Sequence, residues 1–196
     1  MNDCEAMGVA GAARSLRARR GGGAGSMMRT RTDQSAGTSS EHGRVAAAER
    51  LVGLGFRYWL TGFRTGDISC WEKAWCEYSD VLGAKAAKGV VTDLACWVRA
   101  INRHARRDLE TAAVDCERFC RDECIAIEMI SACQHEACPA MRACAFALLG
   151  CSMIEEVVSG AENFAAKMRG ADLVLPRCYS HASSLLAMQP ASTLAQ

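Results

Sequence analysis

The sequence predicts an all-α protein, a compact bundle of about five helices with disordered tails at both ends. Half of the 196 residues are hydrophobic, which is enough to bury a core, and the length suits one ordinary domain. Aromatic residues make up only 6% and proline occurs three times, so the chain lacks the composition typical of sheets and their turns. Apolar residues also recur at intervals of three and four along the middle of the chain, which is the spacing of core-facing helices.

The first helix is predicted over residues 45–63. Its apolar stripe consists of Val45, Ala48, Val52, Phe56, Trp59 and Phe63. Gly53, Gly55 and Gly62 interrupt the same segment, and each lowers helix stability by about 1 kcal/mol relative to alanine. We therefore expect close contact with another helix to compensate at these glycines.

A second helix is predicted to begin after Asp67, a favourable N-cap residue, and to end at Gly83. Its apolar stripe consists of Trp71, Trp75, Tyr78 and Leu82. We assign this aromatic stripe to the core, ahead of a surface that docks a planar ligand or a partner helix. A third helix is predicted from Ala84 or Gly89 to Arg107, with apolar residues along one side.

Two further helices are predicted to form an antiparallel hairpin. The first of them opens at Asp108. One of its faces carries Leu109, Ala113, Cys116, Cys120, Ile127 and Ile130. Pro139 disfavours helix at the residue before it, so a tight connection is predicted over residues 134–138. The last helix then continues to about Met168, with Gly170 as its C-cap.

The two ends of the chain are predicted to be tails around a single domain at residues 43–170. Residues 1–42 are rich in Arg, Gly and Ser, and they offer too little apolar surface to fold alone. An organelle transit peptide and a translation start at Met27 or Met28 are alternative explanations of this segment. Residues 171–196 contain two prolines and many small residues, so we expect a flexible C-terminal tail.

Charge and hydropathy indicate a cytoplasmic protein without a membrane or nucleic-acid partner. The chain has 23 basic and 22 acidic residues, so no overall field favours nucleic acid. No signal-like apolar segment occurs near the start, and the longest uncharged apolar run, residues 143–154, is shorter than the roughly 20 residues that cross a bilayer. In a reducing bacterial cytoplasm, the 12 cysteines are expected to be free thiols.

The cysteines are the strongest compositional signal for a binding site. Cys116, Cys120 and Cys124 are spaced by four, and helical residues i and i+4 lie about 5 to 6 Å apart at Cβ. An antiparallel hairpin would bring Cys151 beside this series, while its tip would gather a second group around His135. Thiolate and imidazole groups favour Cu(I), Zn or an iron–sulfur cluster. The candidate metal ligands are Cys116, Cys120, Cys124, Cys133, His135, Cys138, Cys144 and Cys151.

The spacing of Cys116, Cys120 and Cys124 resembles that of the cysteine-lined four-helix bundles of bacterial copper storage proteins. The resemblance covers residues 116–151 and implies Cu(I) bound along the inside of a bundle. Outside this series, the gaps between cysteines are irregular, and the other helices lack a dense cysteine ladder. The alternative that we favour is core packing, because free cysteine behaves as a small buried hydrophobe.

Two charged features of the sequence also suggest contacts. The densest basic patch consists of Arg99, Arg103, Arg106 and Arg107. This patch is a candidate for binding phosphates or an acidic partner surface, although a solvated helix face is the interpretation that we favour. Glu123 lies on the thiol-bearing apolar face, where an unpaired carboxylate is costly. We expect it to reach a helix end or an arginine of a neighbouring helix, with a role as metal ligand or base as the alternative.

No complete catalytic motif is present in the sequence: phosphate-binding and dinucleotide-binding loops, nucleophile elbows and metalloprotease or di-iron motifs are all missing. We therefore expect a small intracellular accessory or partner-binding protein, with another protein as its partner and no catalysis of its own. The alternative is a thiol-dependent protein that binds metal or handles redox equivalents through residues 116–151.

Overall fold

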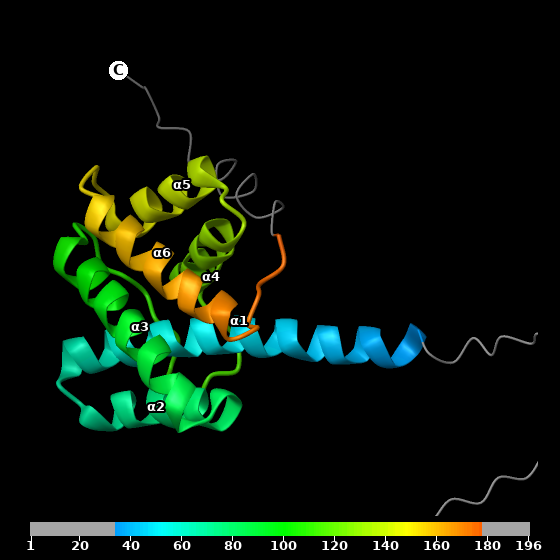
Figure 1. Cartoon of the computed structure of the whole chain (residues 1–196). Coiled ribbons are helices and arrows are strands. Elements are labelled where there is room, and N and C mark those ends of the chain that lie inside the picture. The colour runs from blue at the N-terminus through cyan, green and yellow to red at the C-terminus, as the bar shows by residue number, and fades with distance from the viewer. Residues whose placement is uncertain (1–33, 178–196) are drawn as a thin grey trace, which may run out of the picture.

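The structure, a computed structural model, describes residues 34–177, with side chains from residue 43 onward. This part of the chain contains only helices and irregular connections, which confirms the all-α prediction (Figure 1). Its helices are α1 (Gln34–Thr65), α2 (Ile68–Leu82), α3 (Ala84–His104), α4 (Arg121–Gln134), α5 (Cys138–Leu149) and α6 (Glu155–Gly170). None of these described helices is long and apolar enough to cross a membrane.

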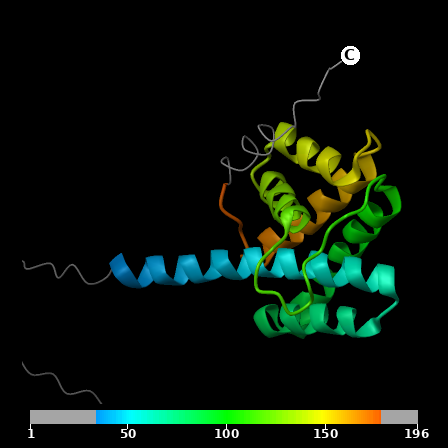
Figure 2. The ribbon, with the colours of Figure 1, turned by 180° about the vertical axis from the view of Figure 1, so that it is seen from behind.

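Helix α1 is the central element of the bundle. It contacts α2, α3 and α4, and its N-terminal part extends beyond the other helices (Figures 1 and 2). Helix α2 lies on one side of α1 and helices α4, α5 and α6 on the other, while α3 crosses α1 and packs against both α2 and α6. Because α1 has neighbours on several sides, residues 51–58 are all buried.

The glycines of α1 lie where neighbouring side chains approach the helix most closely. The approaching side chains are Phe119 at Gly53, Leu94 and Tyr78 at Gly55, and Trp71 at Gly62. A Cβ atom on Gly55 would lie 2.7 Å from Leu94 Cδ2, well inside van der Waals contact. The expected close helix contact therefore occurs at Gly55 and Gly62, whereas Gly53 meets Phe119 of the irregular connection between α3 and α4.

The fourth predicted helix begins at Arg121 in the structure and not at Asp108. Residues 105–120 form an irregular connection. Glu123, in the first turn of α4, accepts a hydrogen bond from the backbone N–H of Cys120 at 2.8 Å, and this capping contact fixes the start of the helix. The helical spacing of the connection was misleading, because buried polar groups bind its backbone in another conformation.

The last predicted helix is interrupted and forms α5 and α6. Helix α5 ends because Gly150 adopts a left-handed conformation with φ of 65°, and its N–H bonds to the carbonyl of Phe146 at 2.8 Å. Helix α6 begins with Glu155 and Glu156, whose charges suit the positive end of the helix dipole. The prediction of one continuous helix was wrong because it overlooked Gly150 as a C-cap.

The predicted tails lie mostly outside the described residues, which exclude residues 1–33 and 178–196. Helix α1 begins at Gln34, so it includes the end of the segment predicted as a tail over residues 1–42.

Residues 171–177, which the sequence analysis assigned to the C-terminal tail, lie against the bundle. Leu173 and Leu175 are buried in the core. The side-chain amide of Gln134 donates to the carbonyl of Leu173 at 2.9 Å and accepts from the N–H of Leu175 at 2.8 Å. The packed part of the chain therefore extends past residue 170.

The aromatic stripe of α2 is only partly in the core. Tyr78 is fully buried and donates a hydrogen bond to a backbone carbonyl of α1 at 2.9 Å. Trp71 stacks against Trp59 of α1, with 5.5 Å between the ring centroids. Trp75, however, is 38% exposed, so its assignment to the core was wrong. Ile68, two turns earlier on α2, is also exposed.

Candidate functional site

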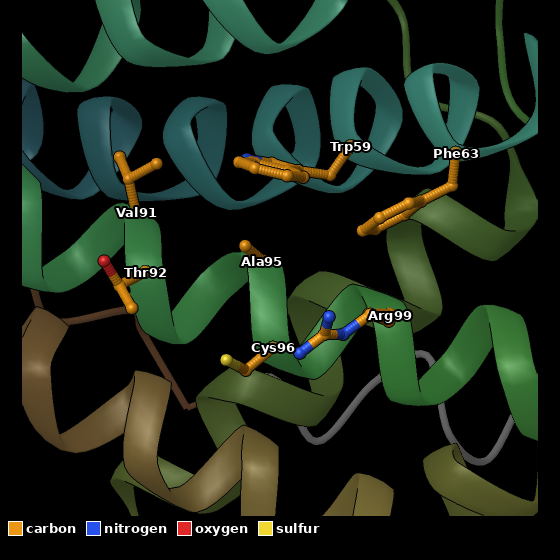
Figure 3. A pocket seen from close by; sticks show the side chains of 7 residues that line it. All are labelled: Trp59, Phe63, Val91, Thr92, Ala95, Cys96 and Arg99. Atoms are coloured by element: carbon orange, nitrogen blue, oxygen red, sulfur yellow. The ribbon is translucent and has the colours of Figure 1, made fainter. Parts of the chain in front are cut away.

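A pocket of about 340 Å³ opens between α1 and α3 (Figure 3). It is lined by Trp59 and Phe63 from α1 and by Val91, Thr92, Ala95, Cys96 and Arg99 from α3. We call it the α1–α3 pocket. Its volume falls in the range of pockets that hold small ligands, and its lining combines aromatic rings with one guanidinium group.

One wall of the α1–α3 pocket is a rigid aromatic surface. Trp59 and Phe63 lie one helical turn apart, with their ring centroids separated by 5.6 Å, and both point from α1 toward α3 (Figure 3). Trp71 of α2 supports both rings: it stacks on Trp59 at 5.5 Å and meets Phe63 edge-on at 5.8 Å. These contacts stabilise the arrangement of the two rings, and the wall is present in the structure without a ligand.

The opposite wall is one face of α3. Val91 and Ala95 face the ring of Trp59, and the small side chain of Ala95 leaves the space open (Figure 3). Thr92 lies at the rim, where its hydroxyl donates to the carbonyl of Lys88 at 2.8 Å. The hollow therefore exists because a small residue of α3 faces a large ring of α1.

Arg99 is the one charged residue among those that line the pocket. It is exposed, and among the described residues it makes no hydrogen bond or ion pair. The pKa of Glu156 is lowered mainly by a hydrogen bond with His104 at 2.6 Å. The charges of Arg103 and Arg99 lower it less, so the interaction between Arg99 and Glu156 is weak. The guanidinium of Arg99 thus keeps its N–H donors available for a ligand.

The basic patch predicted on the third helix is divided in the structure. Arg99 lies at the pocket, and Arg106 is exposed beyond the end of α3. Arg103 lies 4.0 Å from a carboxylate of α6. Arg107 is half-buried, and its guanidinium donates to the carboxylate of Asp122 at 2.9 Å. Arg107 therefore ties α4 to the end of α3, and only the other three arginines face solvent.

Four of the candidate metal ligands do not form one series on a helix, although Cys124 follows Cys120, the N-cap residue of α4, by one turn. Cys116 and Cys120 belong to the irregular connection before α4, so the i and i+4 geometry of a helix does not join them. Cys124 is exposed on α4. Cys151 follows the end of α5, and its Sγ lies 3.7 Å from the carbonyl oxygen of His104. The predicted thiol series along one helix face is therefore not formed.

The remaining candidates lie near the connection between α4 and α5. Cys133 and Cys144 are buried in the core, while Cys138 is exposed. His135 Nε2 lies 2.8 Å from the carbonyl oxygen of Leu175, so this ring binds the C-terminal segment. Among the residues that the structure describes, no three His, Cys, Asp or Glu side chains come together to hold a metal ion. Copper, zinc or iron–sulfur binding therefore stays a hypothesis from the sequence.

Burial raises the pKa of Cys133 and the pKa of Cys144 to about 12. Both thiols are therefore neutral near pH 7 and fill core positions without presenting thiolates. Because the folded-state pKa is raised, these groups stabilise the fold fully below the unfolded pKa of about 9. This contribution is lost as the pH rises from 9 toward 12.

We expect the free energy of unfolding to fall more steeply with pH above about pH 9 in the wild type than in a Cys133→Ala/Cys144→Ala double variant. Urea unfolding at a series of alkaline pH values measures the two slopes. A Cys76→Ala/Cys96→Ala variant, which removes two exposed thiols, is the control and keeps the wild-type slope. Identical slopes for the wild type and the buried double variant would contradict the assignment.

The sequence analysis did not identify the α1–α3 pocket. Periodicity places Trp59 and Phe63 on the core stripe of the first helix, yet both are only partly buried. Arg99 is the one pocket residue that the sequence marks as a candidate for binding. The hollow depends on which residue of α3 faces Trp59, and no pattern within a single helix shows how two helices cross.

Comparisons of the chain with protein-family models, with curated proteins and with solved structures found no match. Function is therefore inferred from the geometry and chemistry of the residues themselves.

Proposed function

We propose that this protein is a non-catalytic, cytoplasmic helical binding module that receives an apolar side chain of a partner protein in the α1–α3 pocket. The observation that carries the proposal is the aromatic wall of Trp59 and Phe63, which faces open space beside Ala95. Aromatic side chains and arginine dominate the binding energy of protein interfaces, where they form or fill pockets at the centre of the contact. The α1–α3 pocket combines both kinds of residue.

The rigidity of the wall supports a binding role. Trp59 is held between Phe63 and Trp71, with ring-centroid distances of 5.6 and 5.5 Å. A side chain that is already fixed loses little conformational entropy when a ligand binds, so more of the contact energy contributes to affinity.

The chemistry of the lining favours binding over catalysis. The lining contains no histidine and no carboxylate, the side chains that most often transfer protons in enzymes. Thr92 and Cys96 would need a neighbouring base to act as nucleophiles, and the lining supplies none. An apolar wall with one cation can nevertheless position a ligand.

A cytoplasmic location accompanies this proposal. The cysteines with described positions are all free thiols, and several of them, such as Cys76, Cys96 and Cys138, are exposed. Exposed thiols persist in compartments that are kept reducing. This observation supports the cytoplasm as the place where the partner is met.

The proposal is tested by titrating the protein with N-phenyl-naphthylamine, an uncharged aromatic probe that fluoresces in apolar surroundings. We expect saturable binding at one site, and Ala95→Leu should weaken it by roughly tenfold or more because the added side chain fills the pocket. The matched control is Ala143→Leu, the same change at an exposed alanine of α5 beside the exposed Phe146. The proposal fails if the probe does not bind, or if the two leucine variants behave alike.

A further inference from the structure

We infer that the partner segment is an acidic helix: it places an apolar residue in the α1–α3 pocket and a carboxylate, one turn away, on Arg99. This inference rests on the proposed function and specifies the chemistry of the partner. It starts from the charges along the exposed edge of α3 next to the pocket.

The exposed edge of α3 is basic or neutral along its whole length. Residues spaced by three and four share one side of a helix. This side carries Lys85, Lys88, Thr92, Cys96, Arg99 and Arg103, which are all exposed. We call these residues the basic stripe of α3. Cations lie at both ends of the stripe, Arg99 among them lines the pocket, and the stripe contains no carboxylate.

Two carboxylates lie near the basic stripe: Asp93 of α3, one turn before Cys96 on the neighbouring side of the helix, and Glu156 of α6, which is already shared. Glu156 of α6 lies 2.6 Å from His104 and 4.0 Å from Arg103. Arg99 has no such partner among residues 43–177, and it is the cation that lines the pocket. A carboxylate from another molecule would therefore find at Arg99 a charged donor that needs no displacement of an existing ion pair.

The spacing along α3 sets the spacing in the partner. Arg99 follows Ala95 by four residues, which is about 6 Å along the helix. A partner helix that lies along α3 with its apolar residue over Ala95 therefore brings a side chain four residues away to Arg99. Depending on its direction, the acidic residue precedes or follows the apolar one.

A protein partner fits the site better than a nucleic acid. The basic stripe carries few cations within a chain whose formal net charge is only +1, whereas nucleic-acid sites neutralise many phosphates. Trp71 also covers Trp59 by stacking, so this ring is not free on both sides for bases. The observations therefore favour an acidic helix.

The test uses two alanine-based helical peptides that compete with N-phenyl-naphthylamine for the full-length chain. One contains Glu-x-x-x-Phe-x-x-x-Glu, which serves either direction of binding, and its twin has Gln in place of both Glu. We expect the Glu peptide to displace the probe at a concentration about two- to fivefold lower. This preference should disappear with Arg99→Gln and at about 1 M NaCl, where charges are screened.

The control variant is Arg106→Gln, which removes an exposed arginine beyond the end of α3 and should keep the preference. Equal displacement by the two peptides, or a preference that survives Arg99→Gln, would overturn the acidic partner while leaving the binding module intact. If oligo-dT displaces the probe more strongly than the Glu peptide does, the partner is a nucleic acid and not a protein. If Arg99→Gln weakens the binding of anilinonaphthalene sulfonate and neither peptide displaces the uncharged probe, the occupant is a small anion. Failure of the uncharged probe itself to bind would instead reject the proposed function.

Discussion

Replacing Arg57 by methionine is expected to lower the free energy of unfolding by about 3–5 kcal/mol, one of the two largest effects of a single substitution that we predict. Arg57 and Glu123 are fully buried, and the guanidinium donates to both carboxylate oxygens at 2.7 and 3.0 Å. It also donates to the backbone carbonyls of Ala113, Cys116 and Arg118. The substitution would leave a buried carboxylate and three carbonyls without these donors.

Urea unfolding of Arg57→Met measures this loss. A second variant, Arg57→Met/Glu123→Leu, removes both charges and should recover part of the lost stability, because no unpaired charge stays buried. The assignment would be wrong if Arg57→Met lowered the free energy of unfolding by less than about 1 kcal/mol. It would also be wrong if the loss in the double variant equalled the sum of the losses in Arg57→Met and Glu123→Leu.

The same ion pair explains why residues 105–120 have no regular structure. A connection of this length without helix or strand is uncommon in a compact domain. Arg57 binds three of its carbonyls, and Glu123 accepts from the N–H groups of Ala112 and Cys120. These charged groups satisfy the backbone in place of helical hydrogen bonds.

The second large effect is expected at Trp97, where alanine should cost about 3–5 kcal/mol. Trp97 is fully buried and joins three helices: its ring stacks on Phe164 of α6 at 5.7 Å and lies 6.1 Å from Phe56 of α1. Its indole N–H has no hydrogen-bond partner among the described residues, so the loss comes from packing and the resulting cavity.

Trp75→Ala is the matched comparison, because the same side chain is removed from the partly exposed side of α2. We expect a loss of about 1–2 kcal/mol or less, since much of the ring is already in water. Thermal or urea unfolding of the two variants gives the difference directly. Equal losses would show that the burial assigned to one of the two tryptophans is incorrect.

The sequence predicts those parts of the fold that depend on local spacing. The apolar stripe over residues 45–63, the N-cap at Asp67 and the end of α2 at Gly83 all occur in the structure. The expected pairing of Glu123 is also confirmed. Its carboxylate binds Arg57 of another helix and the N–H of Cys120 at the start of its own helix. These features follow from periodicity, capping preferences and the cost of burying a charge.

The sequence does not predict features that depend on contacts between distant segments. The spacing of Leu109, Ala113 and Cys116 is helical, but Arg57 binds the backbone of this segment from another helix. The hypothesis of a thiol series at Cys116, Cys120 and Cys124 relied on that helix. The α1–α3 pocket depends in the same way on the position of Ala95 opposite Trp59, which is set by helix crossing.

The most direct test of the binding site observes the indole N–H resonances of the four tryptophans by NMR while N-phenyl-naphthylamine is added. Single Trp→Phe variants assign the signals. Binding in the α1–α3 pocket predicts that the signal of Trp59 shifts most, that of Trp71 shifts through their stacking, and those of Trp75 and Trp97 stay in place. A shift confined to Trp75 would instead place the binding surface on the exposed side of α2 and contradict the account.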